Sequence, residues 1–87
     1  MNFDPGDIVI TAGASEELDQ ADVLLYLHAH LSGDWGLLDT EDKEINEKAL
    51  EFGDRLFSAY KDRKGTKFYI ITEADRSVTT VLLPDEY

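Results

Sequence analysis

The sequence contains no cysteine, no basic residue before Lys43 and no long apolar run. Without cysteine, the chain forms no disulfide framework, no cysteine-ligated zinc site and no cysteine nucleophile. The longest apolar stretch, residues 23–31, is interrupted by His28 and His30 and is too short to span a bilayer. Residues 1–7 lack the basic and apolar regions of a signal peptide. We therefore expect a cytosolic protein with no membrane contact.

Basic residues are few, and they are distributed unevenly along the chain. The net charge is −11, and residues 1–54 hold 14 Asp and Glu against two Lys. Residues 55–87 hold five acidic and six basic residues, so the whole excess lies in the first part of the chain. Such a field repels nucleic acids and anionic membranes and attracts basic surfaces. We expect a basic partner and no direct contact with nucleic acid.

The length of 87 residues allows one modest core, so we expect a single domain over residues 1–87. Residues 8–11 are β-branched and predict a short strand. A helix is expected to begin with Ser15 as N-cap and to end at Leu31 or Ser32, before Gly33. Because the second half of this helix is apolar nearly all round, we expect it to lie between the sheet and a second helix.

The second helix is predicted over residues 41–52, capped by Asp39 or Thr40 and ended by Gly53. Helical periodicity puts Ile45, Ala49 and Phe52 on one face, which we expect to be buried. The opposite face is predicted to be acidic and holds Glu44, Glu47, Lys48 and Glu51.

Three strands are predicted over residues 55–61, 67–72 and 77–83, where β-branched and aromatic residues gather between short polar turns. If Glu73 pairs with Ser77 across the last turn, Ile70 faces Thr80. The expected fold is α+β, with two helices packed on a small antiparallel sheet, in the order β-α-α-β-β-β and with a C-terminal meander. The pattern leaves the place of the first strand in the sheet open.

Catalytic and metal-binding motifs are not found. His28 and His30 chelate a metal only if they lie on a strand, since residues two apart on a helix point about 200° from each other. One packed and one half-exposed histidine is the simpler interpretation. The acidic run from Asp39 fails as a calcium loop because Glu44 stands at the sixth position, where the loop needs glycine. We therefore expect no enzyme, no metal and no cofactor.

Trp35 lies between Gly33 and Gly36, at the corner between the two predicted helices. A tryptophan here is either a contact residue for a partner or a core residue that fills the corner. We favour the core, because a single tryptophan between two helices is more often a core residue than a contact residue.

The region from Gly33 to Tyr87 resembles a family of short proteins found on phages, plasmids and integrated elements. The resemblance rests on GDWG at 33–36, KFYIITEADRS at 67–77 and TTVLLP at 79–84. It also includes Asn46, Ala49, Gly53, Arg55, Ser58 and Tyr60. Members are often labelled plasmid-related or type I restriction subunits, yet this chain lacks the motifs of a methyltransferase. The resemblance implies a mobile-element setting, in which inhibitors of host defence are carried.

The sequence resembles, in class and not in motif, the acidic anti-CRISPR and anti-restriction proteins that imitate DNA. The main hypothesis is therefore a monomeric, non-enzymatic inhibitor in the bacterial cytosol that binds the nucleic-acid-binding surface of a CRISPR effector. Its partner-binding residues would be Asp34, Asp39, Glu41, Asp42, Glu44, Glu47, Glu51 and Asp54. The alternatives are an antitoxin or immunity protein that neutralises a basic toxin, and a small metal protein or enzyme that uses His28 or His30.

Overall fold

The computed structural model describes residues 2–87, which form three α-helices, four strands and one 3₁₀ turn. The elements in chain order are β1 (Asp7–Ile10), α1 (Ala12–Glu17), α2 (Gln20–Leu31), α3 (Thr40–Phe52), β2 (Leu56–Lys61), β3 (Lys67–Thr72), β4 (Val78–Leu82) and η1 (Pro84–Glu86). The α+β class is confirmed.

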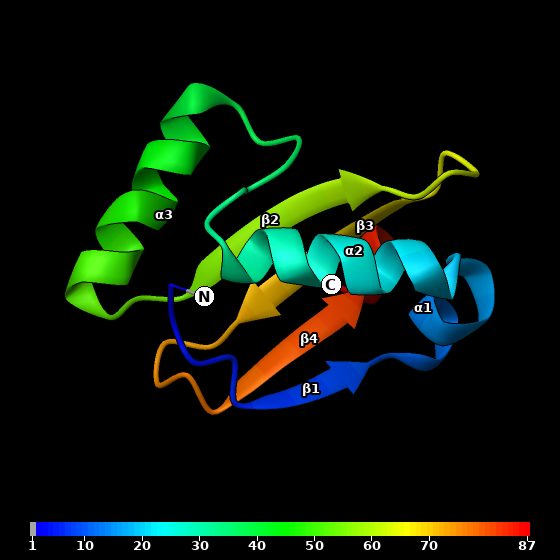
Figure 1. The fold of residues 1–87 in the computed structure, drawn as a ribbon, viewed down its shortest axis with the longest axis horizontal. Helices are drawn as coiled ribbons and strands as arrows, with labels where there is room; N and C mark the ends of the chain where they lie inside the picture. Colours follow the sequence, from blue (N-terminus) through cyan, green and yellow to red (C-terminus); the bar gives the residue numbers. More distant parts are fainter. Residues whose placement is uncertain (1) are drawn as a thin grey trace.

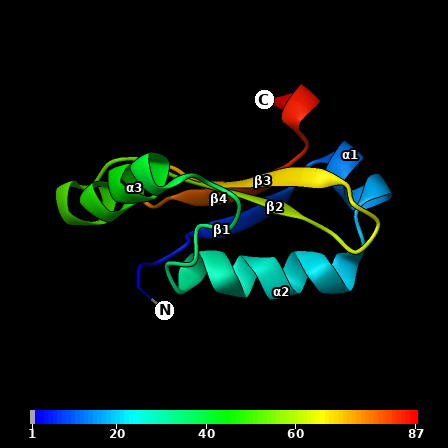
Figure 2. The ribbon, with the colours of Figure 1, turned by 90° about the horizontal axis from the view of Figure 1, so that it is seen from above.

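The sheet has the order β1-β4-β3-β2, and α2 lies across one of its faces (Figures 1 and 2). Strands β2, β3 and β4 form the expected antiparallel meander. Strand β1 pairs in parallel with β4, so the sheet is mixed. The parallel pair is possible because three helices and two strands separate β1 from β4 along the chain, which gives room for the crossover that parallel strands need.

The prediction of one continuous first helix is wrong, because the helix is interrupted at Leu18, which separates α1 from α2. Thr11, and not Ser15, caps α1 by accepting a hydrogen bond from the backbone N–H of Ala14. Leu18 is extended and 4% exposed, and Asp19 then caps α2. The break drives the Leu18 side chain into the core and turns α2 across the sheet.

The expectation that α2 lies between the sheet and the second helix is also wrong. Helix α3 packs beside β2 at one end of the molecule, well away from the outer face of α2 (Figures 1 and 2). Leu24 and Leu25 on α2 are therefore 68% and 59% exposed. Apolar residues all round a helix did not indicate burial on every side.

Helix α3 begins and ends as predicted, with Asp39 as N-cap and Gly53 in the left-handed conformation at its C-terminus. Its buried face differs from the prediction: Asn46 and Ala49 point inward, while Ile45 and Phe52 are 59% and 71% exposed. The cause is Asn46. Its side-chain amide bonds both backbone groups of Phe57 at the edge of β2, with donor–acceptor distances of 2.6 and 3.1 Å.

The predicted register between β3 and β4 is wrong by one residue. Ile70 lies opposite Val81 and not Thr80, and Glu73 closes the turn by donating its N–H to Val78. The turn takes an extra residue because Arg76 adopts a positive φ of 61°. The Arg76 guanidinium donates to the backbone oxygens of Ala49 and Asp54 at the end of α3, which fixes the turn in this conformation.

The interior contains a continuous chain of side-chain hydrogen bonds centred on His30, which is fully buried. Its Nδ1 lies 2.5 Å from the Ser58 hydroxyl and its Nε2 lies 2.9 Å from the Thr72 hydroxyl. Thr72 contacts Thr79, and Thr79 donates to the carbonyl of Pro5. A carbonyl only accepts, so each hydroxyl donates toward Pro5 and His30 carries its proton on Nε2. Nδ1 then accepts from Ser58.

Burial lowers the pKa of His30 to about 4, and the Arg76 charge contributes to the same shift. Since the unfolded histidine titrates near 6.5, the unfolded chain binds the extra proton between these two pH values. The contribution of His30 to stability is therefore complete above pH 6.5 and is lost as the pH falls toward 4.

We expect this loss to reach about 3 kcal/mol of unfolding free energy between pH 7 and pH 4. Urea denaturation at several pH values measures it. His30→Gln should flatten the slope in this window while lowering stability at pH 7, because the hydrogen-bond chain is interrupted. His28→Gln is the matched control, since His28 is exposed. An unchanged slope in His30→Gln would contradict the assignment.

Candidate functional site

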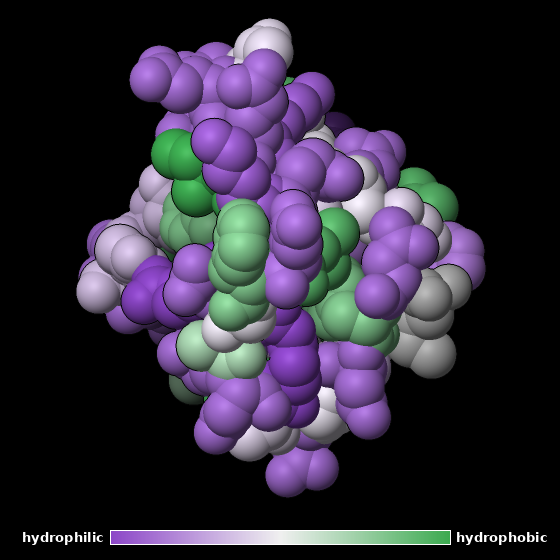
Figure 3. Space-filling view, turned by 90° about the vertical axis from the view of Figure 1, so that its left-hand side faces the viewer, coloured by the Kyte–Doolittle hydropathy of each residue, from purple (hydrophilic) through white to green (hydrophobic). Residues whose placement is uncertain are grey.

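We define the acidic end as the eight carboxylates that the sequence predicts to bind a partner: Asp34, Asp39, Glu41, Asp42, Glu44, Glu47, Glu51 and Asp54. The structure brings them together on α3, the corner before it and the residue after Gly53, and all eight are exposed. Figure 3 looks onto this end, which is mostly hydrophilic with separate hydrophobic patches between the polar side chains. The predicted surface is therefore formed by one element and its flanks.

Two of these carboxylates shape the backbone around them. Asp39 accepts the N–H of Asp42 at 2.9 Å and so caps α3. Asp34 accepts the N–H of Gly36 at 3.1 Å and holds the corner before the helix. Glu41 and Asp42 follow in the first turn, where the positive end of the helix dipole stabilises negative charge. The acidic residues at the start of α3 thus stabilise the helix on which they lie.

The acidic end is not neutralised by the rest of the protein. Among residues 2–87, the ion pairs are those that Arg63 forms with Asp19 and Asp22, outside the acidic end. Arg76 lies nearby but binds backbone oxygens at the end of α3. The carboxylates of Glu41, Glu44 and Glu51 therefore remain available to a partner.

Glu47 has a structural role that the sequence did not reveal. Its carboxylate accepts a hydrogen bond from the indole Nε1 of Trp35 at 2.6 Å. Trp35 is 3% exposed and packs with Ala49 and Leu56, so its prediction as a core residue is confirmed. Glu47 is the partner of an otherwise buried donor, and only a part of its charge faces outward.

Sequence periodicity also missed two exposed apolar side chains within the acidic end. Ile45 and Phe52 lie seven residues apart on α3, which puts them on one flank of the helix. Both were expected in the core, and both are more than half exposed. The rotation of α3 around Asn46 places them among the carboxylates.

The two histidines lie in different surroundings and are not paired as a chelate would need. His28 is exposed and His30 is buried, which is the simpler interpretation given above. Among residues 2–87 no three His, Asp or Glu side chains are grouped for a metal ion. His30 does contact Ser58, but both residues are 0% exposed, so no substrate reaches them.

A surface pocket of about 340 Å³ lies next to Asp34 and is also lined by Tyr26, Leu37, Tyr60 and Lys61. The Tyr60 phenol donates to the backbone oxygen of Asp34 and stacks on Tyr26 with ring centres 4.8 Å apart. Burial raises the pKa of Tyr60, so the phenol stays protonated and supplies no base.

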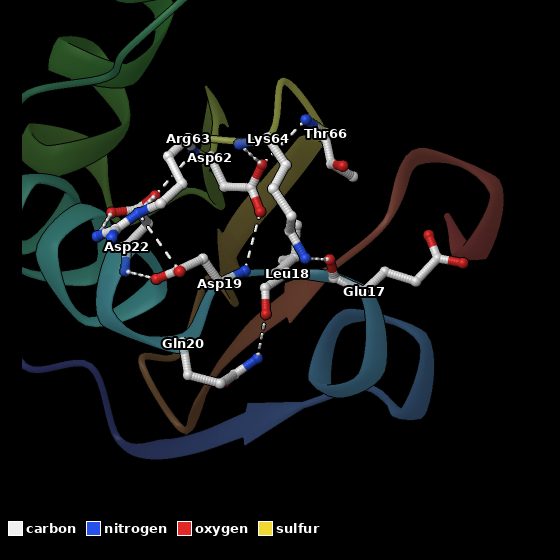
Figure 4. A network of polar contacts seen from close by, with 9 residues as sticks. All are labelled: Glu17, Leu18, Asp19, Gln20, Asp22, Asp62, Arg63, Lys64 and Thr66. Atoms are coloured by element: carbon white, nitrogen blue, oxygen red, sulfur yellow. Dashed lines mark hydrogen bonds and ion pairs between the residues drawn. The ribbon is translucent and has the colours of Figure 1, made fainter.

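A second polar cluster, drawn in Figure 4, was not foreseen. Arg63 bridges Asp19 and Asp22 at the start of α2, and Asp62 accepts the N–H groups of Asp19, Lys64 and Thr66. The Arg63 hydrogen bonds hold the pKa of Asp22 below its usual value. These groups satisfy one another, so the cluster fixes the β2–β3 turn against α2 and offers no ligand site. A sequence signal is lacking, since 41 residues separate Arg63 from Asp22.

We expect Glu47→Ala to lower stability by roughly 1–2 kcal/mol, because the Trp35 indole loses its acceptor. Thermal denaturation combined with tryptophan fluorescence tests this, since the emission of the indole should shift as its surroundings change. Glu44→Ala removes the same charge one turn away and should leave both signals unchanged. Equal effects of the two substitutions would show that Trp35 does not need Glu47.

Comparison of the chain with known protein families, with curated proteins and with solved structures finds no match. Residues 2–87 contain no helix with the length and apolarity needed to cross a membrane. The geometry and charge of the acidic end therefore carry the functional interpretation.

Proposed function

We propose that the protein is a non-enzymatic inhibitor whose acidic end binds the basic, nucleic-acid-binding surface of another protein. The observation that carries the proposal is a set of eight exposed carboxylates on one helix and its flanks, none of which forms an ion pair within residues 2–87. Carboxylates three and four residues apart on a helix lie roughly 5–6 Å from each other, a charge spacing comparable with that of a nucleic-acid strand. The acidic end would occupy the site of the nucleic acid.

The apolar pair on α3 supports a protein partner over a simple counterion atmosphere. Phe52 and Ile45 expose large side chains among the carboxylates. Interfaces commonly combine a few buried apolar or aromatic anchors with a charged rim. In this arrangement the carboxylates supply attraction and orientation, and Phe52 supplies contact area that does not depend on salt.

The partner we propose is a nucleoprotein complex of host defence, with a CRISPR effector subunit as the first candidate. This choice follows from the resemblance described above and from the positive grooves that such complexes present to nucleic acid. The protein then acts as a monomer in the bacterial cytosol, without metal or cofactor.

A charge-reversal experiment tests the proposal. Glu47 must be spared because it holds Trp35, so the variant combines Glu41→Lys, Glu44→Lys and Glu51→Lys. Wild-type protein immobilised on a support is expected to retain a DNA- or RNA-binding protein from bacterial lysate at low salt and to release it at high salt. The free protein should then compete with nucleic acid for the captured partner, and the triple variant should fail in both assays.

The matched control combines Glu16→Lys, Glu17→Lys and Asp85→Lys, three exposed carboxylates on α1 and η1 that change the net charge equally. Retained capture and competition in this control, with loss in the first variant, supports the acidic end as the site. Equal loss in both variants would show a general charge effect. A captured protein that binds nucleic acid equally well in the presence of the wild type contradicts the proposal.

A further inference from the structure

The face of the sheet opposite α2, which we call the open face, carries no helix; only η1 and the residue after it fold back over one part (Figure 2). Side chains alternate along β2 and β3, so every second residue points to this face. Tyr60 and Phe68 contact Tyr26 of α2, whereas Phe57 and Tyr69 point the other way and contact Tyr87. The open face therefore carries different side chains from the face that packs against α2.

Three aromatic rings gather on the open face. The ring centres of Phe57 and Tyr69 are 4.6 Å apart, and Tyr87 lies 6.0 Å from each of them. Phe57 and Tyr69 are only half-buried, and Tyr87 is 68% exposed. A core would seal such rings against a helix, yet here they remain accessible from solvent.

Cations flank the aromatic rings on both sides. The Lys67 ammonium lies 5.6 Å from the Tyr69 ring centre, and the Arg55 guanidinium lies 5.3 Å from that of Tyr87. Lys61 stands directly opposite Lys67 in the β2–β3 register, at the edge of the sheet, where it also borders the pocket beside Asp34. These side chains form one cationic and aromatic strip, which consists of Arg55, Phe57, Tyr87, Tyr69, Lys67 and Lys61.

The positive charge of the lysine pair is not neutralised by the fold. Like charges directly opposite each other on neighbouring strands destabilise a sheet. The chain has 19 acidic residues, yet within residues 2–87 neither lysine forms an ion pair. Both side chains are exposed. Two unneutralised positive charges side by side favour the binding of an anionic group at this place.

We infer that this strip binds a short segment of single-stranded nucleic acid. Aromatic side chains on an open sheet face stack with unpaired bases, and neighbouring lysines bind the backbone phosphates. The strip follows β2 from Arg55 to Lys61, about 20 Å of extended chain, which accommodates only a few nucleotides. Stacking on aromatic rings is open to every base, so we expect the strip to distinguish single strands from duplexes more than one sequence from another.

The two ends of the strip differ, and this sets the position of the phosphates. Glu73 and Glu86 line a pocket of about 200 Å³ beside Arg55 and Tyr87. Their charge offsets that of Arg55, so the lysine end attracts phosphate more strongly. Bases then stack over Tyr69 and Phe57, with Tyr87 and its partner Arg55 closing the far side.

This inference does not depend on the proposed function, because the open face and the acidic end share no residue. The net charge of −11 opposes a long polyanion over most of the surface. Binding is therefore local, and it qualifies the expectation that the protein makes no direct contact with nucleic acid.

The experiment measures fluorescence anisotropy of labelled oligothymidylate with the purified full chain at several low salt concentrations. Wild-type protein is expected to bind single-stranded but not double-stranded DNA. Lys61→Gln combined with Lys67→Gln should lower the slope of log affinity against log salt by about 0.7 for each phosphate contact that is lost. Tyr69→Ser should weaken binding about tenfold or more through the loss of stacking.

The matched control is Lys43→Gln combined with Lys48→Gln, which removes two exposed lysines from α3 and gives the same net charge. This control should keep the salt slope of the wild type. An identical decrease in both double variants, or no binding by the wild type at the lowest salt, overturns the inference. Circular dichroism spectra confirm that the variants are folded, and the lysine pairs keep the test valid if Tyr69→Ser unfolds.

Discussion

The hydrogen-bond chain through His30 is the interaction on which the arrangement of the elements depends. It joins α2 to β2, β3 and β4 and ends on the segment before β1. The ring of His30 also contacts the edges of Phe3 and Trp35, so it connects the main core under α2 with the smaller core around Trp35. A polar chain in this place orients both cores, because each donor has a single acceptor and a shifted helix would leave several buried groups unsatisfied.

The second constraint is the protection of the β2 edge. Asn46 occupies both backbone groups of Phe57, and the corner before α3 occupies those of Ala59 through Trp35 and Leu37. Side chain and corner thus replace a fifth strand and block pairing with another sheet at this edge. The same contacts fix the rotation of α3. The direction of the acidic end is therefore a consequence of edge protection, and the exposure of Phe52 follows from it.

Local chemistry made α3 and the three meander strands predictable. Asp39, Gly53 and the β-branched runs determine their own conformations through caps, positive φ and strand propensity. Most of the failures arise from partners far away in the chain; the exception is the N-cap of α1, where Thr11 bonds Ala14 only three residues away. Helix α1 ends at Glu17 because Asp62, 43 residues later, binds the N–H of Asp19. Arg76 adopts a positive φ because its guanidinium binds the end of α3. Helical periodicity predicted that Ile45 would be buried and not Asn46, because periodicity reflects the polarity of residues and not the hydrogen bonds they form.

The acidic residues were predicted as a site from composition, and the structure groups them on α3 and its flanks, whereas the open face was not foreseen. Residues 1–54 build the helices and the acidic end, while residues 55–87 build three of the four strands. Averaging over the chain hides the cations of residues 55–87, because the eight basic residues of the chain are outweighed by 19 acidic ones. The molecule measures 34 × 27 × 23 Å, whereas the Debye length at physiological salt is about 8 Å. Exposed charges on different faces therefore interact weakly, and a chain with strong net negative charge can present a cationic surface on its sheet. The nucleoprotein partner proposed above would offer complementary charges to both surfaces, since such a complex exposes basic protein beside the nucleic acid it binds.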